Sequence, residues 1–435
     1  MRISPARSIR GQFTPSGDKS ISHRAAIIAA LARGPSLLSN FSTSYDCTST
    51  LNCLRQLGIS ITAANNSQQV VGNGIGGFAE PDSLLDCGNS GSTMRMLAGL
   101  LAGQGFPSQL TGDDSLKSRP MRRIIDPLET MGAQIESNGG RPPLRITPGR
   151  QLNPIRYALP VASAQVKSCV LLAGLHAKGT TSVIEQQGTR DHTERMLEWY
   201  GAPIQTSEQK DGAIEIAVTG KTDFSARNVD IPGDISSAAF MIAAAALLPG
   251  SDLTVRAVGL NPTRTQFLSE LTSLGGRITT AELTAVSNEP VGTIRIEGGL
   301  GPPEQQGTRR IGGQTIAQLI DELPLLAVLG TQISGGIEIR EAAELRVKES
   351  DRIATTVENL RAMGAKVEEY QDGLCVDGPT TLHGALLNSH GDHRIAIAFS
   401  VAALIAEGDS EISGPDCVGV SFPGFFQLLE SLAIR

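Results

Sequence analysis

The chain has 435 residues, of which 40% are hydrophobic, 19% are charged and 4% are aromatic, and its formal net charge is −7. This length exceeds what one hydrophobic core normally supports, so two or three domains are expected. A chain without a basic surplus cannot neutralise the phosphates of DNA or RNA, which argues against nucleic-acid binding as its function. An anionic ligand would instead have to meet a local cluster of Arg and Lys side chains.

Neither the N-terminus nor the apolar runs predict export or membrane insertion. Residues 1–13 are basic but no apolar segment follows them, so no signal peptide is expected. The longest apolar stretches, 238–248 and 395–406, are shorter than the roughly 20 residues that span a bilayer, so we expect buried core helices there. The six cysteines form no CxxC pair, which favours reduced thiols and a cytoplasmic protein.

A repeat with a period of about 70 residues organises the chain. Six Ala-, Leu- and Ile-rich runs begin with small or polar residues and close on glycines, namely Gly34, Gly105, Gly179, Gly250, Gly336 and Gly408. A second set of glycines ends the amphipathic segments, namely Gly58, Gly132, Gly201, Gly275 and Gly364, with Ala433 in the sixth position. Two markers that share one period predict six copies of one α/β unit.

Each copy is predicted to hold one helix that is apolar nearly all round, and therefore buried, and one amphipathic helix that covers it. Six copies divide naturally into two domains of three. Pro and Gly interrupt the pattern at 230–234 and mark a crossover between the domains. The first strand, 3–13, is expected to pair with the other domain, which places a second crossover near 16–18. The expected domains are 18–233, and 1–17 together with 234–435.

Polar residues cluster at the N-terminal ends of the apolar helices in copy after copy. A helix N-terminus presents unpaired N–H groups and a partial positive charge, and it therefore attracts anions. If both trios of helices direct these ends to one cleft, that cleft binds anions strongly. An anionic substrate is therefore predicted.

The first two helix starts supply cations and access to the backbone. GDKSISHR places Lys19, Ser20 and Arg24 within a turn and a half of helix, although a solvated helix start explains them equally well. GNSGSTMR places Gly91 where a ligand can approach the backbone, with Arg95 behind it. A glycine turn with an N-cap is the alternative interpretation.

Further candidates follow in the first half of the chain. Arg119 precedes a proline that is expected to begin a helix. Charge alone does not distinguish it from its basic neighbours, which are Lys117, Arg122 and Arg123. The third helix start and the basic segment after it add Ser163, Gln165 and Lys167, then Arg190 and His192. A lone histidine in such a setting is more often structural than catalytic.

The second half of the chain supplies acids next to cations. DELP sets Asp321 and Glu322 at the start of the fifth apolar helix, where a capping role for one of them competes with catalysis by Asp321. Two further segments mix charges: Lys348, Glu349 and Arg352 in LRVKESDR, and Asp392, His393 and Arg394 in GDHR. Arg352 and Arg394 can each hold a carboxylate or phosphate through two hydrogen bonds. A surface cluster of salt bridges is the alternative for LRVKESDR.

Metal and nucleotide chemistry find no support in the sequence. HExxH, paired CxxC and the phosphate-binding GxxxxGK[ST] loop are absent, so no metal and no cofactor is expected. The glycine-rich stretch 72–78 lacks the strand–helix context of a dinucleotide site.

An ordered set of motifs resembles the 5-enolpyruvylshikimate-3-phosphate synthases, a family of enolpyruvyl transferases. The motifs are DKSISHR, GNSGSTMR, SRPM, ASAQVKS, TRDHTE, NPTRT, DELP, RVKESDR, GDHRIA and SFPGF, and they cover nearly the whole chain. The resemblance implies an α/β fold of two domains that close over a cleft, each an inside-out barrel of three βαβαββ units. It also implies two substrates, phosphoenolpyruvate and shikimate 3-phosphate, and a monomer that glyphosate inhibits.

The family's site residues transfer to matching positions. Those implied for shikimate 3-phosphate are Lys19, Ser20, Arg24, Ser163, Gln165, Arg190, Asp321 and Lys348. Those implied for phosphoenolpyruvate are Lys19, Gly91, Arg119, Gln165, Arg352 and Arg394. Asp321 and Glu349 are the implied acid–base groups, with Lys19 and His393 as possible helpers. Asp321 would remove the proton of the 5-hydroxyl group as this group attacks the protonated phosphoenolpyruvate.

Two departures from the family pattern and two rival functions stay open. Val420 stands where many members have a lysine, so one phosphoenolpyruvate contact is absent or comes from elsewhere. Several motifs resemble the glyphosate-tolerant branch, yet residue 91 is Gly where that branch tends to carry Ala. The rival functions are the sister transferase that acts on UDP-N-acetylglucosamine through a reactive cysteine, and a non-catalytic anion-binding homologue. The intact acids Asp321 and Glu349 argue against the second rival.

Overall fold

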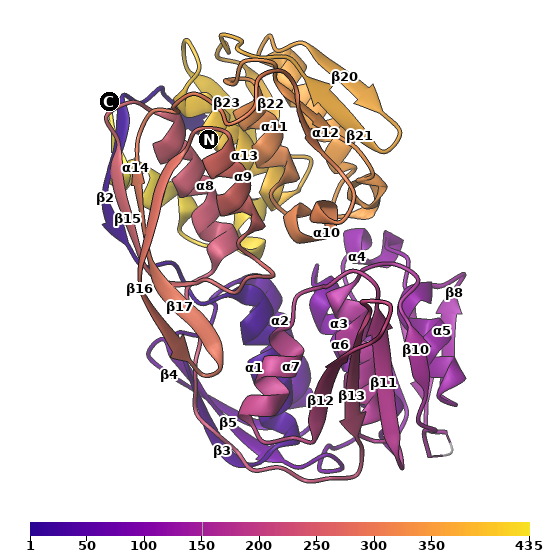
Figure 1. Ribbon diagram of the computed structural model, residues 1–435. Helices are drawn as coiled ribbons and strands as arrows, with labels where there is room; N and C mark the ends of the chain where they lie inside the picture. The colour runs from indigo at the N-terminus through magenta and orange to yellow at the C-terminus, as the bar shows by residue number, and fades with distance from the viewer. Residues whose placement is uncertain (150) are drawn as a thin grey trace. The chain divides into compact units, whose positions relative to one another are not determined.

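The computed structural model describes residues 1–149 and 151–435, and the chain divides into two compact units (Figure 1). The N-terminal unit comprises Gly17–Pro232 and Ala285–Glu289. The C-terminal unit comprises Met1–Ser16, Gly233–Thr284 and Pro290–Arg435. The chain passes between the units after Ser16, after Pro232, and at both ends of 285–289. The sequence pattern gave no indication of this third exchange.

Three buried helices form the centre of the N-terminal unit: α1 (Lys19–Leu31), α3 (Gly91–Ala102) and α6 (Ala164–Gly174). α3 packs so closely on α6 that a Cβ atom added to Gly99 would lie 2.2 Å from the carbonyl oxygen of Cys169. Only glycine permits that approach. Amphipathic helices surround this centre: α2 (Tyr45–Gln56), α5 (Arg122–Thr130) and α7 (His192–Trp199), with the short α4 (Asp114–Ser118).

Three four-stranded sheets complete the N-terminal unit, and each combines one parallel pair with two antiparallel pairs. The first runs β14 (Val229–Asp230), β3 (Arg33–Ser39), β5 (Ser67–Asn73), β4 (Ser60–Ala64). The second runs β6 (Leu85–Asp86), β7 (Ser108–Thr111), β9 (Arg141–Thr147), β8 (Gln134–Asn138). The third runs β10 (Arg156–Ala158), β11 (Thr180–Glu185), β13 (Ile214–Thr219), β12 (Ile204–Glu208).

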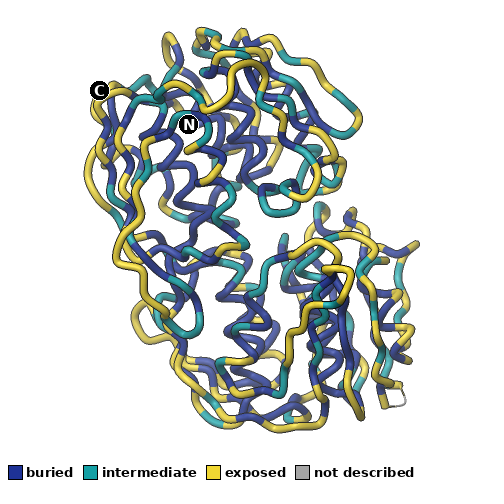
Figure 2. The backbone as a smooth tube through the Cα atoms, viewed as in Figure 1, coloured by how far each residue is buried: buried dark blue, intermediate teal, exposed yellow. Residues whose placement is uncertain are grey.

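The C-terminal unit also has three buried helices in mutual contact: α8 (Ile235–Leu247), α11 (Leu323–Gly330) and α13 (His393–Leu404). Figure 2 shows these helices as buried backbone beneath more exposed strands and loops. The other helices are α9 (Gln266–Ser273), α10 (Thr315–Leu319), α12 (Arg352–Ala362) and α14 (Phe425–Leu432), with 3₁₀ turns η1 (Ala343–Val347) and η2 (Pro415–Val420).

The sheets of the C-terminal unit have three, four and five strands. The first runs β1 (Arg2–Ile3), β23 (Ser410–Ser413), β22 (Leu386–Asn388). The second runs β18 (Arg309–Ile311), β19 (Ile337–Ile339), β21 (Gly373–Val376), β20 (Val367–Tyr370). The third runs β16 (Arg277–Val286), β17 (Glu289–Glu297), β15 (Asp252–Gly259), β2 (Ser8–Phe13), β24 (Ala433–Ile434). The single strand expected at 3–13 is instead two strands, β1 and β2. Both pair within the C-terminal unit, β1 with β23 and β2 with β15, so the predicted pairing with the other domain is confirmed.

The helix predictions are confirmed, since all six apolar runs are buried helices. Glycines that follow the amphipathic helices adopt the left-handed conformation expected of a C-terminal stop, for example Gly58 at φ 82° and Gly364 at φ 90°. No described helix is long and apolar enough to cross a membrane. The six cysteines are free thiols, and Cys47, Cys53, Cys87 and Cys169 are buried.

Candidate active site

The start of α1 places two predicted cations among fixed partners. The Asp18 carboxylate caps the helix by accepting a hydrogen bond from the backbone N–H of Ile21 at 2.9 Å. Lys19 Nζ lies 3.0 Å from Asp46 Oδ2. Arg24, only 4% exposed, donates from Nε to Thr193 Oγ1 at 2.7 Å and from its Nη2 to a serine hydroxyl of α6. Arg24 therefore links the starts of α1, α6 and α7, rather than lying on a solvated helix face.

Gln165 is held between two helices. Its Oε1 accepts a hydrogen bond from Arg95 Nη1 at 2.6 Å, and its Nε2 donates to Ser92 Oγ at 2.8 Å. Ser163 caps α6, with its Oγ 3.4 Å from the backbone nitrogen of Val166. The amide of Gln165 is therefore oriented by α3 before any ligand arrives. The sequence motifs had not indicated the contact with Arg95.

Gly91 and Arg119 meet at the start of α3. Arg119 is buried, and it donates to Asn89 Oδ1 at 2.6 Å and to Ser115 Oγ at 3.0 Å. A Cβ atom at residue 91 would lie 2.6 Å from Arg95 Nη1 and 3.6 Å from Arg119 Nη1. Glycine at this position therefore lets two guanidinium groups approach the backbone.

The expectation that Pro120 begins a helix is wrong. Arg119 is instead the C-terminal cap of α4, and α5 begins at Arg122 after the N-cap residue Met121. Proline fits the intervening turn because its missing N–H leaves no bond to satisfy there.

His192 is structural, as its setting in the sequence suggested. It is buried, and its Nδ1 lies 2.7 Å from Oε1 of Glu289, which begins β17 directly after the turn that follows β16. In the same turn, Asn288 accepts a hydrogen bond from Arg195 on α7 and donates another to the backbone of that residue. The segment 285–289 therefore fixes the beginning of α7, directly after Arg190.

Lys167 points into the interior of the N-terminal unit. It is 0% exposed, and its Nζ lies 3.1 Å from Glu185 Oε1 and 2.5 Å from Glu194 Oε1. Burial raises the pKa of Glu194 above its ordinary value, although the charge of Lys167 opposes that shift. Thr189 also donates to the Glu185 carboxylate. This buried cluster braces the region between Ser163 and Arg190, and the sequence gave no sign of its two acids.

In the C-terminal unit, Arg352 is the centre of an acidic cluster. It is 1% exposed, and it donates to Asp392 Oδ2 at 2.8 Å, to Glu349 Oε2 at 2.6 Å and to Asp321 Oδ1 at 3.5 Å. Burial alone would lower the pKa of Arg352, but the charges of Asp392, Glu349 and Asp321 outweigh it and hold that pKa above its ordinary value. The alternative of a surface salt-bridge cluster is therefore wrong for this arginine.

Asp321 lies between two arginines. Besides Arg352, it approaches Arg394, whose Nη2 is 3.8 Å from Asp321 Oδ2. Arg394 is buried over the ring of Phe240, and its Nη1 lies 3.5 Å from Glu322 Oε1. Glu322 stands at the N-cap position of α11 without a side-chain cap bond, so this carboxylate does not have the capping role that was one alternative for DELP. Its carboxylate turns instead toward α8.

Two further predicted residues, Lys348 and His393, are close in sequence to this cluster. Lys348 Nζ is 2.8 Å from Glu344 Oε1. His393 is buried as the first residue of α13, directly after Asp392, whose side chain caps that helix. Each unit thus gathers cations and polar groups at the starts of its buried helices. The cations and backbone N–H groups at these helix starts can bind anions. Carboxylates such as Asp321 and Glu349 can transfer protons to or from a bound substrate.

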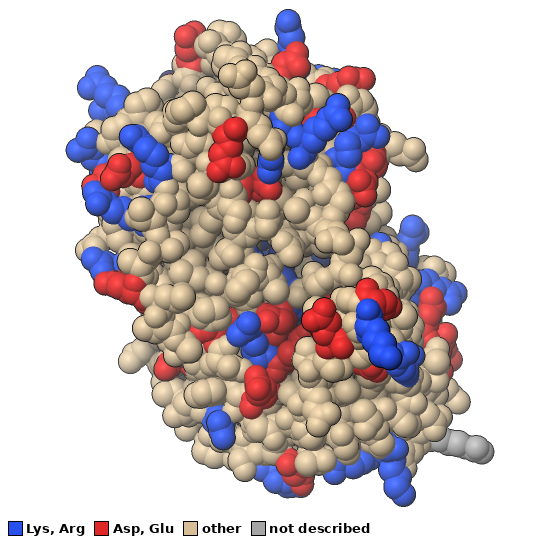
Figure 3. Space-filling model, in the orientation of Figure 1, with Lys and Arg blue, Asp and Glu red and all other residues tan. Residues whose placement is uncertain are grey.

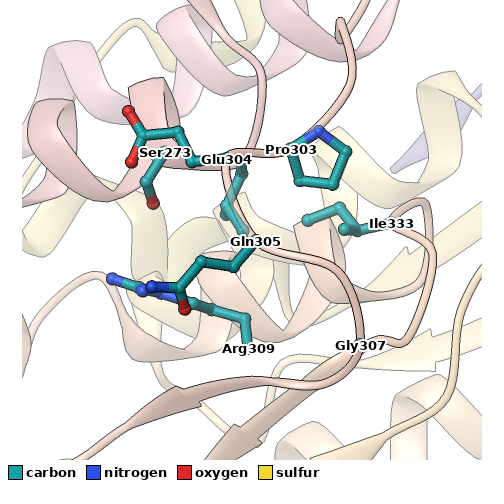
Figure 4. Close-up of a pocket in the computed structure, with 8 residues that line it drawn as sticks. Ser273, Pro303, Glu304, Gln305, Gly307, Arg309 and Ile333 are labelled. Carbon is teal, nitrogen blue, oxygen red and sulfur yellow. The ribbon is translucent and has the colours of Figure 1, made fainter.

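The face of the molecule drawn in Figure 3 shows no comparable concentration. On the face in Figure 3, basic and acidic side chains are interspersed over a mostly neutral surface. A small hollow in the C-terminal unit is lined by Ser273, Leu274, Pro303, Glu304, Gln305, Gly307, Arg309 and Ile333 (Figure 4). It contains none of the candidate residues, and its Arg309 is paired with Glu270 at 2.6 Å.

Comparison with known proteins places the chain in one family. Residues 3–429 match the family model of EPSP synthase (3-phosphoshikimate 1-carboxyvinyltransferase). The 3-phosphoshikimate 1-carboxyvinyltransferase of Koribacter versatilis is 50% identical over 435 residues, covering 100% of this chain and 99% of the relative. That of Pelotomaculum thermopropionicum is 48% identical over 439 residues, with the same coverage.

Solved structures agree. The EPSP synthase of Acinetobacter baumannii superposes with a TM-score of 0.85 at 40% identity, covering 100% of this chain and 98% of that one. The mixed α/β fold is therefore shared with these enzymes. This chain belongs to the EPSP synthase (3-phosphoshikimate 1-carboxyvinyltransferase) family.

Proposed function

We propose that this protein transfers the enolpyruvyl group of phosphoenolpyruvate to the 5-hydroxyl of shikimate 3-phosphate and releases phosphate, a step toward chorismate and the aromatic amino acids. The observation that carries the proposal is Asp321, a carboxylate between the two buried arginines Arg352 and Arg394, in a chain whose whole length matches this family. That arrangement combines two anion-binding groups with a base.

Shikimate 3-phosphate is proposed to bind at the helix starts of the N-terminal unit. Its ligands there are Lys19, Ser20, Arg24, Ser163, Gln165 and Arg190, and those from the C-terminal unit are Asp321 and Lys348. The hydrogen bonds that orient Arg24 and Gln165 support this assignment, because side chains already in place lose little conformational freedom on binding.

Phosphoenolpyruvate is proposed to bind through Arg119, Arg352 and Arg394, with Lys19, Gln165 and the Gly91 backbone. A guanidinium group presents two parallel donors that match a carboxylate or phosphate. Val420, the last residue of η2, has no charged side chain. The positive charge that binds phosphoenolpyruvate is therefore proposed to come mainly from the arginines.

The reaction needs a proton donor and a proton acceptor. A proton adds to the methylene carbon of phosphoenolpyruvate, and the 5-hydroxyl oxygen attacks the neighbouring carbon while its own proton passes to Asp321. The C–O bond to phosphate then breaks, and loss of a methyl proton restores the double bond. Glu349 is the second acid–base group, with Lys19 and His393 as helpers. Each such proton transfer accelerates the reaction roughly 10²- to 10⁴-fold.

We also propose the finer architecture of the family for this chain. It consists of six βαβαββ units in two inside-out α/β barrels, with domains at 18–233 and at 1–17 with 234–435. The six sheets and their buried helices support this description. The protein is further proposed to be a cytoplasmic monomer that glyphosate inhibits in competition with phosphoenolpyruvate.

The cysteines argue against the UDP-N-acetylglucosamine reaction. That chemistry requires a thiol that ionises readily. Burial raises the pKa of Cys47 to about 12 and that of Cys417 to about 11, and it also raises the pKa of Cys87, Cys169 and Cys375. These thiols are poor nucleophiles at neutral pH.

A phosphate-release assay tests the proposal. The purified protein is incubated with phosphoenolpyruvate and either shikimate 3-phosphate or UDP-N-acetylglucosamine, and the product is identified by its mass. We expect phosphate and an enolpyruvyl ether only with shikimate 3-phosphate. Release with the UDP-sugar alone, or binding of both anions without turnover, would replace the proposal with one of the two rival functions.

A further inference from the structure

One motif of the sequence takes no part in the proposed reaction. NPTRT, at 261–265, places Arg264 in the interior of the C-terminal unit. Asn261 shapes this turn, because its Oδ1 accepts hydrogen bonds from the backbone and the hydroxyl of Thr263 at 2.9 and 2.8 Å. The turn therefore holds Arg264 in a defined direction.

Arg264 begins a chain of buried polar contacts that we call the Glu322 relay, formed by Arg264, Ser236, Glu322 and Arg394. Arg264 Nη2 donates to Ser236 Oγ at 2.7 Å, and Ser236 Oγ donates to Glu322 Oε1 at 2.5 Å. The same Glu322 oxygen lies 3.5 Å from Arg394 Nη1. All four residues are buried, so the relay lies where electrostatic interactions are strong.

The far end of the relay touches a connection between the units. Arg264 Nη2 is 3.6 Å from Oδ1 of Asp234, the residue that caps α8. The backbone N–H of Asp234 also donates to the carbonyl of Ser16, where the chain leaves the C-terminal unit for the first time. The relay thus joins α8 to the guanidinium group of Arg394.

We propose that Glu322 is a positioning residue that orients Arg394 toward phosphoenolpyruvate, with Ser236 and Arg264 holding its carboxylate in place. This inference rests on the proposed function, because it takes Arg394 as a phosphoenolpyruvate ligand. Arg394 reaches Asp321 with Nη2 and Glu322 with Nη1, so one edge of its guanidinium group faces both carboxylates. Glu322 fixes the rotation of that group and keeps it from collapsing onto Asp321 when the base must remain available.

Glu322→Gln tests this role with almost no change of shape. A charged acceptor makes a hydrogen bond roughly twice as strong as a neutral one, so we expect the KM for phosphoenolpyruvate to rise about 10-fold. The dissociation constant of shikimate 3-phosphate should change less than twofold, and kcat should fall less than the KM rises. If Glu322 instead competes with phosphoenolpyruvate for Arg394, its neutralisation would lower the KM for phosphoenolpyruvate. That result would overturn the positioning role.

Glu270→Gln is the matched control. Glu270 is 4% exposed, as Glu322 is, and it is also paired with an arginine, Arg309. Its side-chain partners are Arg309 and Gln266, neither of which belongs to the relay. Loss of stability alone should affect both variants alike. A KM for phosphoenolpyruvate in Glu322→Gln within twofold of that in Glu270→Gln would refute the inference.

Ser236→Ala is a second test of the relay, to be used if circular dichroism shows that Glu322→Gln does not fold. The substitution removes only the hydroxyl between Arg264 and Glu322, and we expect a three- to fivefold rise in the same KM, in the range of one neutral hydrogen bond. An unchanged KM in this variant would equally refute the relay. A wild-type protein that is inactive with both substrates would instead refute the proposed function, so the two failures are distinguishable.

Discussion

Replacement of Gly91 by Ala should separate inhibitor binding from substrate binding. The added Cβ atom would lie 2.6 Å from Arg95 Nη1, which is closer than a real methyl contact, and 3.6 Å from Arg119 Nη1, which is an ordinary contact. The guanidinium group of Arg95 must therefore move. Its movement breaks the 2.6 Å hydrogen bond to Gln165 and leaves Arg119 nearly undisturbed.

The magnitude follows from these two contacts. Overpacking costs about 1–3 kcal/mol, so we expect inhibition by glyphosate, the longer molecule, to weaken roughly 10- to 100-fold. Loss of the Arg95–Gln165 hydrogen bond costs about 1 kcal/mol, so the KM for phosphoenolpyruvate should rise only about fivefold.

Steady-state kinetics with varied phosphoenolpyruvate at several glyphosate concentrations measure both constants. Gly105→Ala is the control, because Gly105 is exposed and a Cβ atom there meets nothing within 4 Å. In an Arg95→Met background, Gly91→Ala should change the KM little further, because the Arg95–Gln165 hydrogen bond is already absent and the added methyl group has no guanidinium group to displace. If wild type resists glyphosate and Gly91→Ala leaves the inhibition constant unchanged, the placement of Gly91 against the inhibitor is wrong.

Three further predictions concern the base, the thiols and the buried ion cluster. Asp321→Asn should keep the affinity for shikimate 3-phosphate but lower kcat about 100-fold or more, as expected when a general base is lost. The control Asp252→Asn, at an exposed ion pair with Arg295, should leave kcat unchanged. Near-normal turnover of Asp321→Asn would remove Asp321 from the mechanism. Single Cys→Ala variants should all retain turnover, and loss of activity in one stably folded variant would reopen the UDP-sugar function. The pKa of Glu194 is higher in the folded than in the unfolded protein because the carboxyl group is buried. The protonated carboxyl group therefore contributes its full stability below the unfolded-state pKa, and this contribution is lost as the pH rises through the folded-state pKa. Thermal unfolding of Glu194→Gln should therefore improve relative to wild type between pH 4 and pH 8, and a constant difference across that range would contradict the raised pKa.

Local sequence determined the secondary structure and most of the residues that begin the buried helices. Asp18, Ser90 and Ser163 cap α1, α3 and α6 as short polar side chains do before apolar runs, and each contact spans three residues. The glycines that stop the amphipathic helices were likewise readable, because only glycine adopts a positive φ without strain. These features depend on neighbours in the chain, so pattern and spacing reveal them.

Only the tertiary structure decided which polar side chains meet. Glu289 is 97 residues from His192, Gln165 is 70 from Arg95, and Glu322 is 86 from Ser236. Each pair joins residues from different sheets or helices, and local spacing in the sequence does not indicate which side chains become partners. The direction of Lys167 was decided in the same way, since the two carboxylates that hold its charge in the core come from β11 and α7. A charge at a helix start turns outward to a ligand or inward to a buried acid, and the packing of distant elements makes that choice because only they supply the compensating charge.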